Sequence, residues 1–267
     1  MTDDQPPAGS AGHGAALVLL DVADGEARIT LNSPANRNAL SRAVRAQLHR
    51  ALTTVSADPA VRVVVITHRG PVFCSGMDLK EEAVAAPGQQ GVRELPPILQ
   101  LISRCPKPVL AGVKGAARAG GIGVLAAADI VVAAPAATFA FSEVRIGLIP
   151  AVLTVPVLDR VAPAPARELM LTGEVFGAAR ALDIGLINAV DEDVDAAVAR
   201  YVRALLAGGP TALAGTKALL RRGRDDSDDR YAELLELSAT QFAGDEAREG
   251  ARSFAEKRPA SWVRVSE

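Results

Sequence analysis

The sequence predicts an α/β protein, in which short buried strands alternate with helices before a helical C-terminal region. Two apolar runs, 61–67 and 109–113, are each followed by a turn that contains glycine. Continuous apolar runs of this length are typical of strands buried in a parallel sheet. From residue 193 onward, helical patterns replace the strand patterns. The chain therefore combines a sheet-based core with a helical layer.

The composition suits one soluble globular core. The chain has 267 residues, of which 49% are hydrophobic and 22% charged, with a net charge of −2. This charge and an aromatic content of 3% give no basis for nucleic-acid binding. The two cysteines and three histidines are too scattered for a disulfide framework or a zinc site, so we expect no metal. No apolar run is long enough for a membrane span, and the polar N-terminus is unlike a signal peptide, so we expect a cytoplasmic protein without membrane association.

The first third of the chain is predicted element by element. Residues 1–14 lack periodicity and are expected to form a disordered tail. Asp24-Gly25 is a strong turn signal between strands at 16–21 and 27–31. Ser41 is a candidate N-cap for a helix whose apolar face continues to Val55.

The remaining elements follow from the same signals, with glycine and proline marking their ends. A mobile loop or broken helix is expected at 81–91. Strands are predicted at 61–67, 109–113, 130–133, 139–141 and 186–190. Helices are predicted at 95–104, from about 120 to 128, and at 155–161, 164–172, 178–182, 193–207, 212–220 and 245–256, with a further helix capped by 225–229 that carries an apolar stripe from Tyr231. We expect an α/β core over 15–200 and a helical region over 201–267.

The segment from 109 to 128 organises the core. A helix that begins near Gly120 would present free N–H groups and a partial positive charge to whatever lies before it. Such a helix start suits an anion, or an oxygen that becomes an anion during a reaction.

Three interpretations of this segment remain open at this point. A P-loop would need Lys and Ser or Thr after Gly120, where Gly121 and Ile122 stand, so the phosphate-binding lysine is missing. A dinucleotide-binding fingerprint fits loosely from Gly121 to Ala126, but its first glycine should directly follow the strand. The glycines can also simply permit close packing of a helix on the sheet.

Two further motifs resemble a known family when they are read with the glycine turn. Residues 71–81 read PVFCSGMDLKE, residues 115–121 read GAARAGG, and residues 142–150 read SEVRIGLIP. Together and in this order they resemble the crotonase family of enoyl-CoA hydratases and isomerases. The resemblance implies the crotonase fold, which has repeated ββα units and a helical C-terminal trimerisation region.

The resemblance also implies functional residues. The backbone N–H groups of Ser75 and Gly120 would hold a thioester oxygen as it becomes an enolate. Glu143 would be one of the family's two catalytic glutamates, and it follows a predicted strand, where a partly buried carboxylate suits acid–base work. Residues implied in CoA binding are Arg37, Gly76, Met77, Asp78, Phe254 and Lys257. Phe254 and Lys257 would reach a neighbour's CoA in a homotrimer or homohexamer. The CoA thioester would be the substrate, and no bound cofactor is implied.

One departure from the family pattern leaves the reaction open. The position of the second catalytic glutamate is Gly123, which can carry no proton. The segment that follows Pro150 is also altered. Hydration of a 2-enoyl-CoA is the expected activity. The alternatives are a delta-isomerase that uses one glutamate, and an acyl-CoA-binding homologue with weak catalysis.

Overall fold

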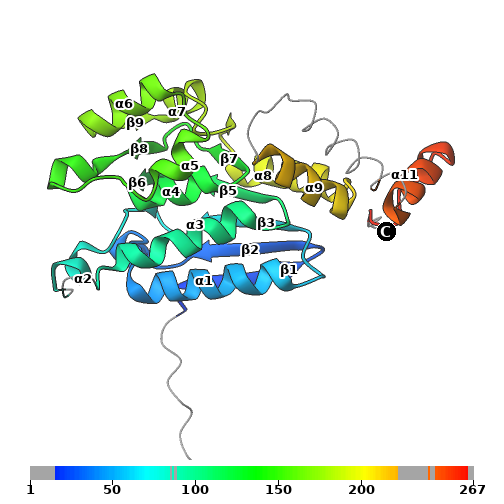
Figure 1. Cartoon of the computed structure of the whole chain (residues 1–267), viewed down its shortest axis with the longest axis horizontal. Helices are drawn as coiled ribbons and strands as arrows, with labels where there is room; N and C mark the ends of the chain where they lie inside the picture. Colours follow the sequence, from blue (N-terminus) through cyan, green and yellow to red (C-terminus); the bar gives the residue numbers. More distant parts are fainter. Residues whose placement is uncertain (1–15, 85, 87–88, 222–239, 241–243, 264–267) are drawn as a thin grey trace, which may run out of the picture.

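The computed structural model describes residues 16–84, 86, 89–221, 240 and 244–263 (Figure 1). The expected N-terminal tail, the cap at 225–229 and the stripe that begins at Tyr231 lie outside the described residues. Strand β1 (Val18–Ala23) pairs with β2 (Glu26–Leu31) as an antiparallel hairpin. Asp24 and Gly25 both have positive φ, at 50° and 85°, as the predicted two-residue turn requires.

A six-stranded sheet forms the centre of the molecule. Its order is β1-β2-β3-β5-β7-β10, and β2 to β10 run parallel. The additional strands are β3 (Val63–His68), β5 (Val109–Val113), β7 (Ile130–Ala133) and β10 (Ala189–Val190). Every residue of β3 and β5 is buried, which explains their uninterrupted apolar sequences.

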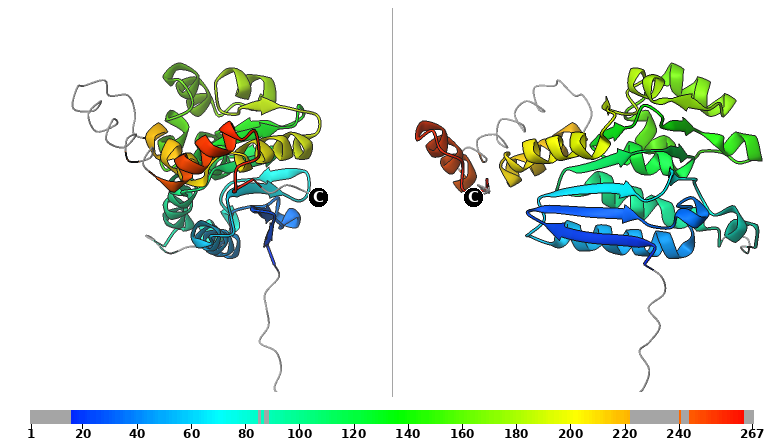
Figure 2. Two further views of the ribbon diagram at one scale, coloured as in Figure 1. Left: turned by 90° about the vertical axis from the view of Figure 1, so that its right-hand side faces the viewer. Right: turned by 180° about the vertical axis from the view of Figure 1, so that it is seen from behind.

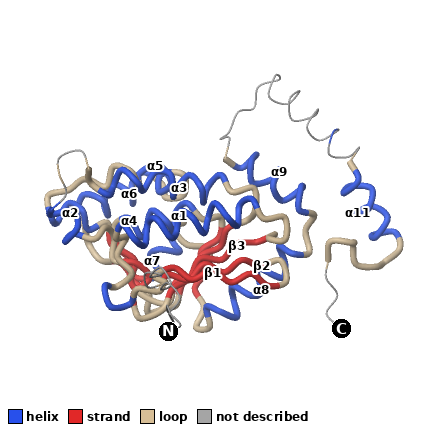
Figure 3. Tube along the Cα trace, turned by 90° about the horizontal axis from the view of Figure 1, so that it is seen from below, coloured by secondary structure: helices blue, strands red, loops and turns tan. Residues whose placement is uncertain are grey.

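Helices cover both faces of this sheet (Figure 3). Helices α1 (Arg42–Ala57) and α3 (Leu95–Arg104) lie on one face, and α8 (Val194–Leu206) packs on the other. The N–H of Val44 donates to the side chain of Ser41, so the predicted N-cap is confirmed. The expected domain boundary at residue 200 falls inside α8, whose buried Val194, Val198 and Val202 pack against the sheet.

A second, four-stranded sheet has the order β4-β6-β8-β9. Its strands are β4 (Val72–Cys74), β6 (Ala116–Arg118), β8 (Thr138–Ala140) and β9 (Phe176–Gly177). β4, β6 and β8 run parallel and follow β3, β5 and β7 closely along the chain. The predicted repeat of two strands and a helix is therefore present. β6 lies between β5 and the glycine helix, which rules out the direct strand-to-glycine connection of a dinucleotide fingerprint.

The remaining described helices are each shorter than α1 and α8. They are α2 (Leu79–Val84), α4 (Gly120–Ala127), α5 (Thr154–Leu158), α6 (Pro163–Thr172), α7 (Ala178–Asp183), α9 (Pro210–Leu220) and α11 (Asp245–Ala255), with 3₁₀ turns at Pro34–Asn36, Gly91–Glu94 and Ser142–Ile146. α2 ends at Val84 and a 3₁₀ turn begins at Gly91, so the described residues of the 81–91 segment agree with the expected broken helix. α11 projects from the end of the molecule opposite α2 (Figures 1 and 2). Within the described ranges, no helix is long and apolar enough to cross a membrane.

Candidate active site

Three turns meet where parallel strands of the second sheet end. Ser75 follows β4, Ala119 follows β6, and Ser142 lies just beyond β8. Because carboxyl ends of parallel strands lie at one edge of a sheet, these turns are neighbours. The N–H of Ala119 donates to the carbonyl oxygen of Ala140, with 3.1 Å between nitrogen and oxygen, and this bond joins the second turn to the third.

The first two turns are in direct contact. A Cβ atom built on Gly76 would lie 2.9 Å from the Cβ of Ala119 and 3.8 Å from the nitrogen of Gly120. Gly76 also has a φ of 91°, a conformation that favours glycine. Ala119 has a φ of 48°, which is strained for a residue with a side chain. The strained backbone places the start of α4 beside the Gly76 turn.

The structure changes one predicted oxygen-binding donor. The N–H of Ser75 donates to the carbonyl oxygen of Arg37 at 3.1 Å, so this N–H is already occupied and the prediction for Ser75 is wrong in this respect. In the peptide unit that joins Gly76 to Met77, the carbonyl of Gly76 accepts from the N–H of Leu40 at 2.8 Å. Since this peptide bond is trans, the N–H of Met77 points the opposite way from that carbonyl.

Two backbone donors therefore remain open side by side. Among the described residues, the N–H groups of Met77 and Gly120 have no hydrogen-bond partner. Gly120 is the first residue of α4, whose N–H groups have no acceptor within the helix. The N–H of Met77 is therefore the candidate donor in place of that of Ser75, and the N–H of Gly120 is open, as the role predicted for it requires.

Asn38 holds the loop whose Arg37 carbonyl accepts from the Ser75 N–H. The sequence patterns did not predict this role of Asn38. Its side-chain amide donates to the carbonyls of Arg69 and Val72 at 3.0 and 2.7 Å, and its oxygen accepts from the N–H of Ser33 at 2.7 Å. Asn38 is fully buried and has a φ of 52°, which asparagine tolerates better than most residues. In the sequence, this loop is marked by the run Asn36-Arg37-Asn38, whose asparagines are common in turns.

Glu143 is a buried carboxyl group that forms no ion pair with any described residue. The residue is 8% exposed, and Oε2 has no hydrogen-bond partner among the described residues. Burial raises the pKa of this carboxyl above the ordinary glutamate value, because desolvation disfavours the charged form. A carboxyl group with a raised pKa, on a turn that neighbours the turns of the open N–H donors, has the properties of a general acid–base group.

Gly123 lies on α4, one turn after Gly120. A Cβ at Gly123 would lie 3.1 Å from the Cβ of Leu153 and 3.6 Å from the side chain of Leu99. Both leucines are buried. The space where a side chain at position 123 would begin is therefore apolar and occupied.

The sequence matches the family model described as enoyl-CoA hydratase/isomerase over residues 22–264. The chain belongs to this family, the crotonase family. A relative from Rhodobacter capsulatus named "Probable enoyl-CoA hydratase" is 39% identical, and the match covers 91% of this chain and 96% of the relative.

Solved crotonase structures share the fold. The crystal structure of an enoyl-CoA hydratase from Mycobacterium smegmatis has a TM-score of 0.87 and is 33% identical, covering 93% of this chain and 99% of that one. An enoyl-CoA hydratase from Mycobacterium avium is 43% identical with a TM-score of 0.72, covering 93% of this chain and all of its own length. The crotonase fold predicted from the sequence is therefore confirmed.

A pocket adjoins the Gly76 turn in this crotonase. It has a volume of about 350 Å³, and its lining includes Arg37, Ser75, Met77, Asp78 and Lys80. Four of these residues belong to the predicted catalytic and CoA-binding set. The cations Arg37 and Lys80 suit a phosphate group.

The remaining predicted CoA contacts lie elsewhere in this subunit. Phe254 is 87% exposed and lies on α11, and Lys257 follows that helix. Because α11 and α2 are at opposite ends of the molecule (Figure 1), the single chain does not bring these two residues to the pocket.

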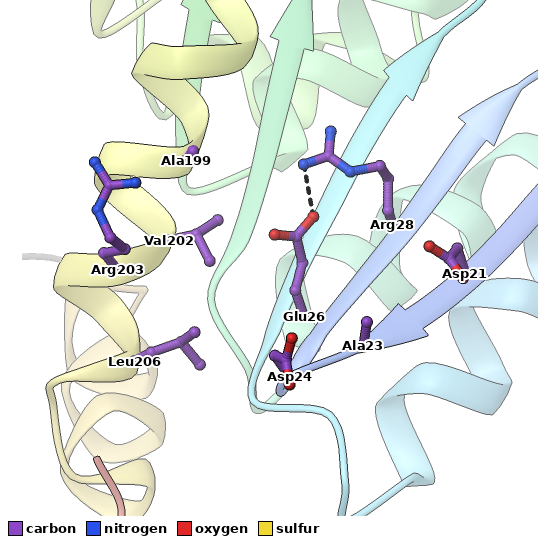
Figure 4. Close-up of a pocket in the computed structure, with 9 residues that line it drawn as sticks. All are labelled: Asp21, Ala23, Asp24, Glu26, Arg28, Ala199, Val202, Arg203 and Leu206. Carbon is purple, nitrogen blue, oxygen red and sulfur yellow. Dashed lines mark ion pairs between the residues drawn. The ribbon is translucent and has the colours of Figure 1, made fainter. Parts of the chain in front are cut away.

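A separate pocket is lined by residues of β1, β2 and α8 (Figure 4). It has about 340 Å³ and lies between the β1–β2 hairpin and α8, with Glu26 and Arg28 forming an ion pair of 2.7 Å. Glu26 is at the amino end of β2, away from the strand ends that form the candidate site. No cluster of metal-ligating side chains occurs in the part of the chain that the structure describes.

Proposed function

We propose that this crotonase is an enoyl-CoA hydratase, which adds water across the double bond of a 2-enoyl-CoA thioester. The observation that carries the proposal is the pair of open N–H donors at Met77 and Gly120, close to the strand end that carries the buried carboxyl of Glu143. The hydratase names of the relatives from Rhodobacter and Mycobacterium agree with it.

The thioester carbonyl oxygen would accept hydrogen bonds from Met77 and Gly120. These bonds strengthen as the oxygen gains negative charge in the enolate, and removing one such donor typically costs about 3 kcal/mol of transition-state stabilisation. The donors are fixed by the backbone, so they require no rearrangement when the charge develops.

Glu143 would handle both hydrogen transfers. As a carboxylate it accepts a proton from water while the water oxygen bonds to the β-carbon and the double-bond electrons move to the thioester oxygen. The resulting carboxylic acid then protonates the α-carbon of the enolate. The raised pKa of Glu143 favours this return of the proton. CoA enters and leaves as part of the substrate, and no step uses a bound cofactor.

Gly123 favours a second candidate, an enoyl-CoA delta-isomerase. Moving a double bond requires only that one group take a proton from one carbon and return it to another. The apolar contacts of Leu153 and Leu99 at Gly123 provide no second acid or base. An acyl-CoA-binding homologue with weak catalysis has the same structural basis.

An absorbance assay separates these functions. Crotonyl-CoA loses its conjugated absorbance when it is hydrated, and a 3-enoyl-CoA gains absorbance when it is isomerised. A hydratase consumes the first substrate faster than it converts the second. Faster conversion of the 3-enoyl-CoA would favour the isomerase, and binding without turnover of either would favour the acyl-CoA-binding homologue.

We also propose that the protein is a homotrimer or homohexamer. Large apolar side chains are exposed beside the candidate site, on the segment after Glu143 and on α5 and α6: Ile146, Leu148, Ile149, Val155, Leu158 and Leu171. Several large exposed apolar side chains in one region of the chain are consistent with subunit contacts. In such an assembly Phe254 and Lys257 would contact CoA bound by a neighbouring subunit.

A further inference from the structure

Arg45 is a buried cation beneath the two donor turns. It is 3% exposed, on α1. Its Nη1 donates to the carbonyl of Leu40, and its Nε donates to Oε2 of Glu94 at 2.9 Å. Glu81 Oε2 lies 3.8 Å from Nη1. A buried guanidinium is stable only when it is paired in this way, so these partners are held together.

Leu40 connects Arg45 to both proposed oxygen-binding donors. Its N–H donates to the Gly76 carbonyl and thereby orients the peptide that carries the Met77 N–H. Its Cδ1 lies 3.1 Å from the position of a Cβ on Gly120. The residue whose carbonyl Arg45 holds therefore sets the direction of one donor and packs against the other.

The two carboxylates extend this connection to the neighbouring segments. Glu94 directly precedes Leu95, whose side chain comes within 3.4 Å of the Cβ position on Gly120. Glu81 lies on α2, the helix that follows the Met77 turn, and its Oε2 also accepts from the N–H of Arg42 at 2.7 Å. One guanidinium thus holds the loop before α1, the start of α3 and α2.

We propose that Arg45 is a positioning residue, which acts through Leu40 and Glu94 to hold the N–H groups of Met77 and Gly120 at the spacing that a thioester oxygen requires. Arg45 does not contact the substrate in this account. The inference rests on the proposed function, because it assigns Arg45 to the proposed oxygen-binding site.

Gly91 provides a way to move Arg45 without removing its charge. A Cβ on Gly91 would overlap the guanidinium group, so Gly91→Ala must displace it. Gly177→Ala is the matched control, because a Cβ there meets no atom within 4 Å among the described residues and Gly177 is on β9, whereas Arg45 is on α1. Glu94→Gln is a second perturbation. It removes the charge of a side chain that is 47% exposed, so folding is expected to survive.

The measurements are kcat and KM with crotonyl-CoA and the infrared carbonyl stretch of a bound acyl-CoA. We expect Gly91→Ala to lower kcat by up to roughly 100-fold, the loss that a misplacement of about 1 Å can cause, with a smaller loss in Glu94→Gln. KM should change little, and the shift of the carbonyl stretch on binding should shrink in both variants. Thermal unfolding confirms that each variant is folded, and Glu94→Gln carries the test if Gly91→Ala does not fold.

The outcomes separate the two proposals. If the original protein hydrates crotonyl-CoA while the folded perturbed variants match Gly177→Ala in kcat and carbonyl shift, Arg45 has no positioning role and the hydratase proposal stands. If the perturbed variants show only a lower stability or only a changed KM, while kcat and the carbonyl shift stay the same, Arg45 is structural and the inference is wrong. If the original protein neither binds nor hydrates the thioester, the hydratase proposal fails and the inference fails with it.

Discussion

A Cβ atom on Gly123 would lie 3.1 Å from the Cβ of Leu153. This contact leads to a prediction about the missing second acid. Gly123→Glu alone should crowd a buried site and destabilise the fold by about 1–3 kcal/mol, without a gain in hydration. Gly123→Glu with Leu153→Ala provides room for the carboxylate and should raise kcat for crotonyl-CoA above that of Leu153→Ala. Equal rates in these two variants would show that a second acid at this position does not assist hydration.

Because Gly76 lies so close to Ala119, we expect the single methyl group added by Gly76→Ala to lower both stability and kcat. Gly76→Ala adds a Cβ at 2.9 Å from the Ala119 Cβ, at a φ of 91°. The turns must separate, so both donors move relative to each other. We expect a loss of about 1–2 kcal/mol from the backbone conformation and a fall in kcat of up to about 100-fold. Steady-state kinetics with chemical denaturation measure both effects, and unchanged kcat in the folded variant would contradict the proposed donor pair.

The raised pKa of Glu143 predicts a pH-dependent stability. At pH values between the ordinary glutamate pKa and the raised folded value, the folded protein keeps a proton that the unfolded chain has lost. Its stability therefore falls as pH rises through this interval, and the effect is complete above the folded pKa. In Glu143→Gln this contribution is absent. The Tm of the original protein minus that of the variant should decrease from below about pH 4 toward neutral pH, whereas a constant difference would argue against a desolvated carboxyl.

The proposed assembly predicts that Lys257 contributes to CoA binding only in an oligomer. Sedimentation at micromolar concentration should find a trimer or hexamer. In that assembly Lys257→Ala should weaken acetoacetyl-CoA binding by about tenfold, the worth of one charge-assisted hydrogen bond, as measured by calorimetry. A monomer with unchanged CoA affinity in the variant would contradict the proposal.

Local sequence patterns were sufficient for most of the central sheet and its helices. The strand at Val109–Val113 and the helix that starts at Gly120 were predicted from apolar runs and glycine turns, and both are present. β6 was missed because Ala116–Arg118 is a three-residue strand of small and charged residues, without a periodic pattern. It pairs with strands that are distant in sequence, so only the tertiary fold defines it.

The oxygen-binding N–H donors of the candidate site also depend on the tertiary fold. Ser75 and Met77 flank Gly76, and the motif alone does not indicate which N–H remains open. The answer depends on Arg37, which lies much earlier in the chain and whose carbonyl accepts a hydrogen bond from the Ser75 N–H. The sequence patterns likewise did not predict the contact between Leu153 and Gly123. These two residues come together only because α4 packs against α5, and Leu153 is the N-cap of α5.

The rate at which Glu143→Gln hydrates crotonyl-CoA tests the acid–base role of Glu143 directly. Glutamine keeps the shape of the side chain but can neither accept nor return the proton. We expect kcat to fall by roughly 10²–10⁴-fold, the usual contribution of general acid–base catalysis, while acetoacetyl-CoA still binds through the Met77 and Gly120 donors. A kcat near that of the original protein would contradict the assignment of Glu143 as the group that moves the proton.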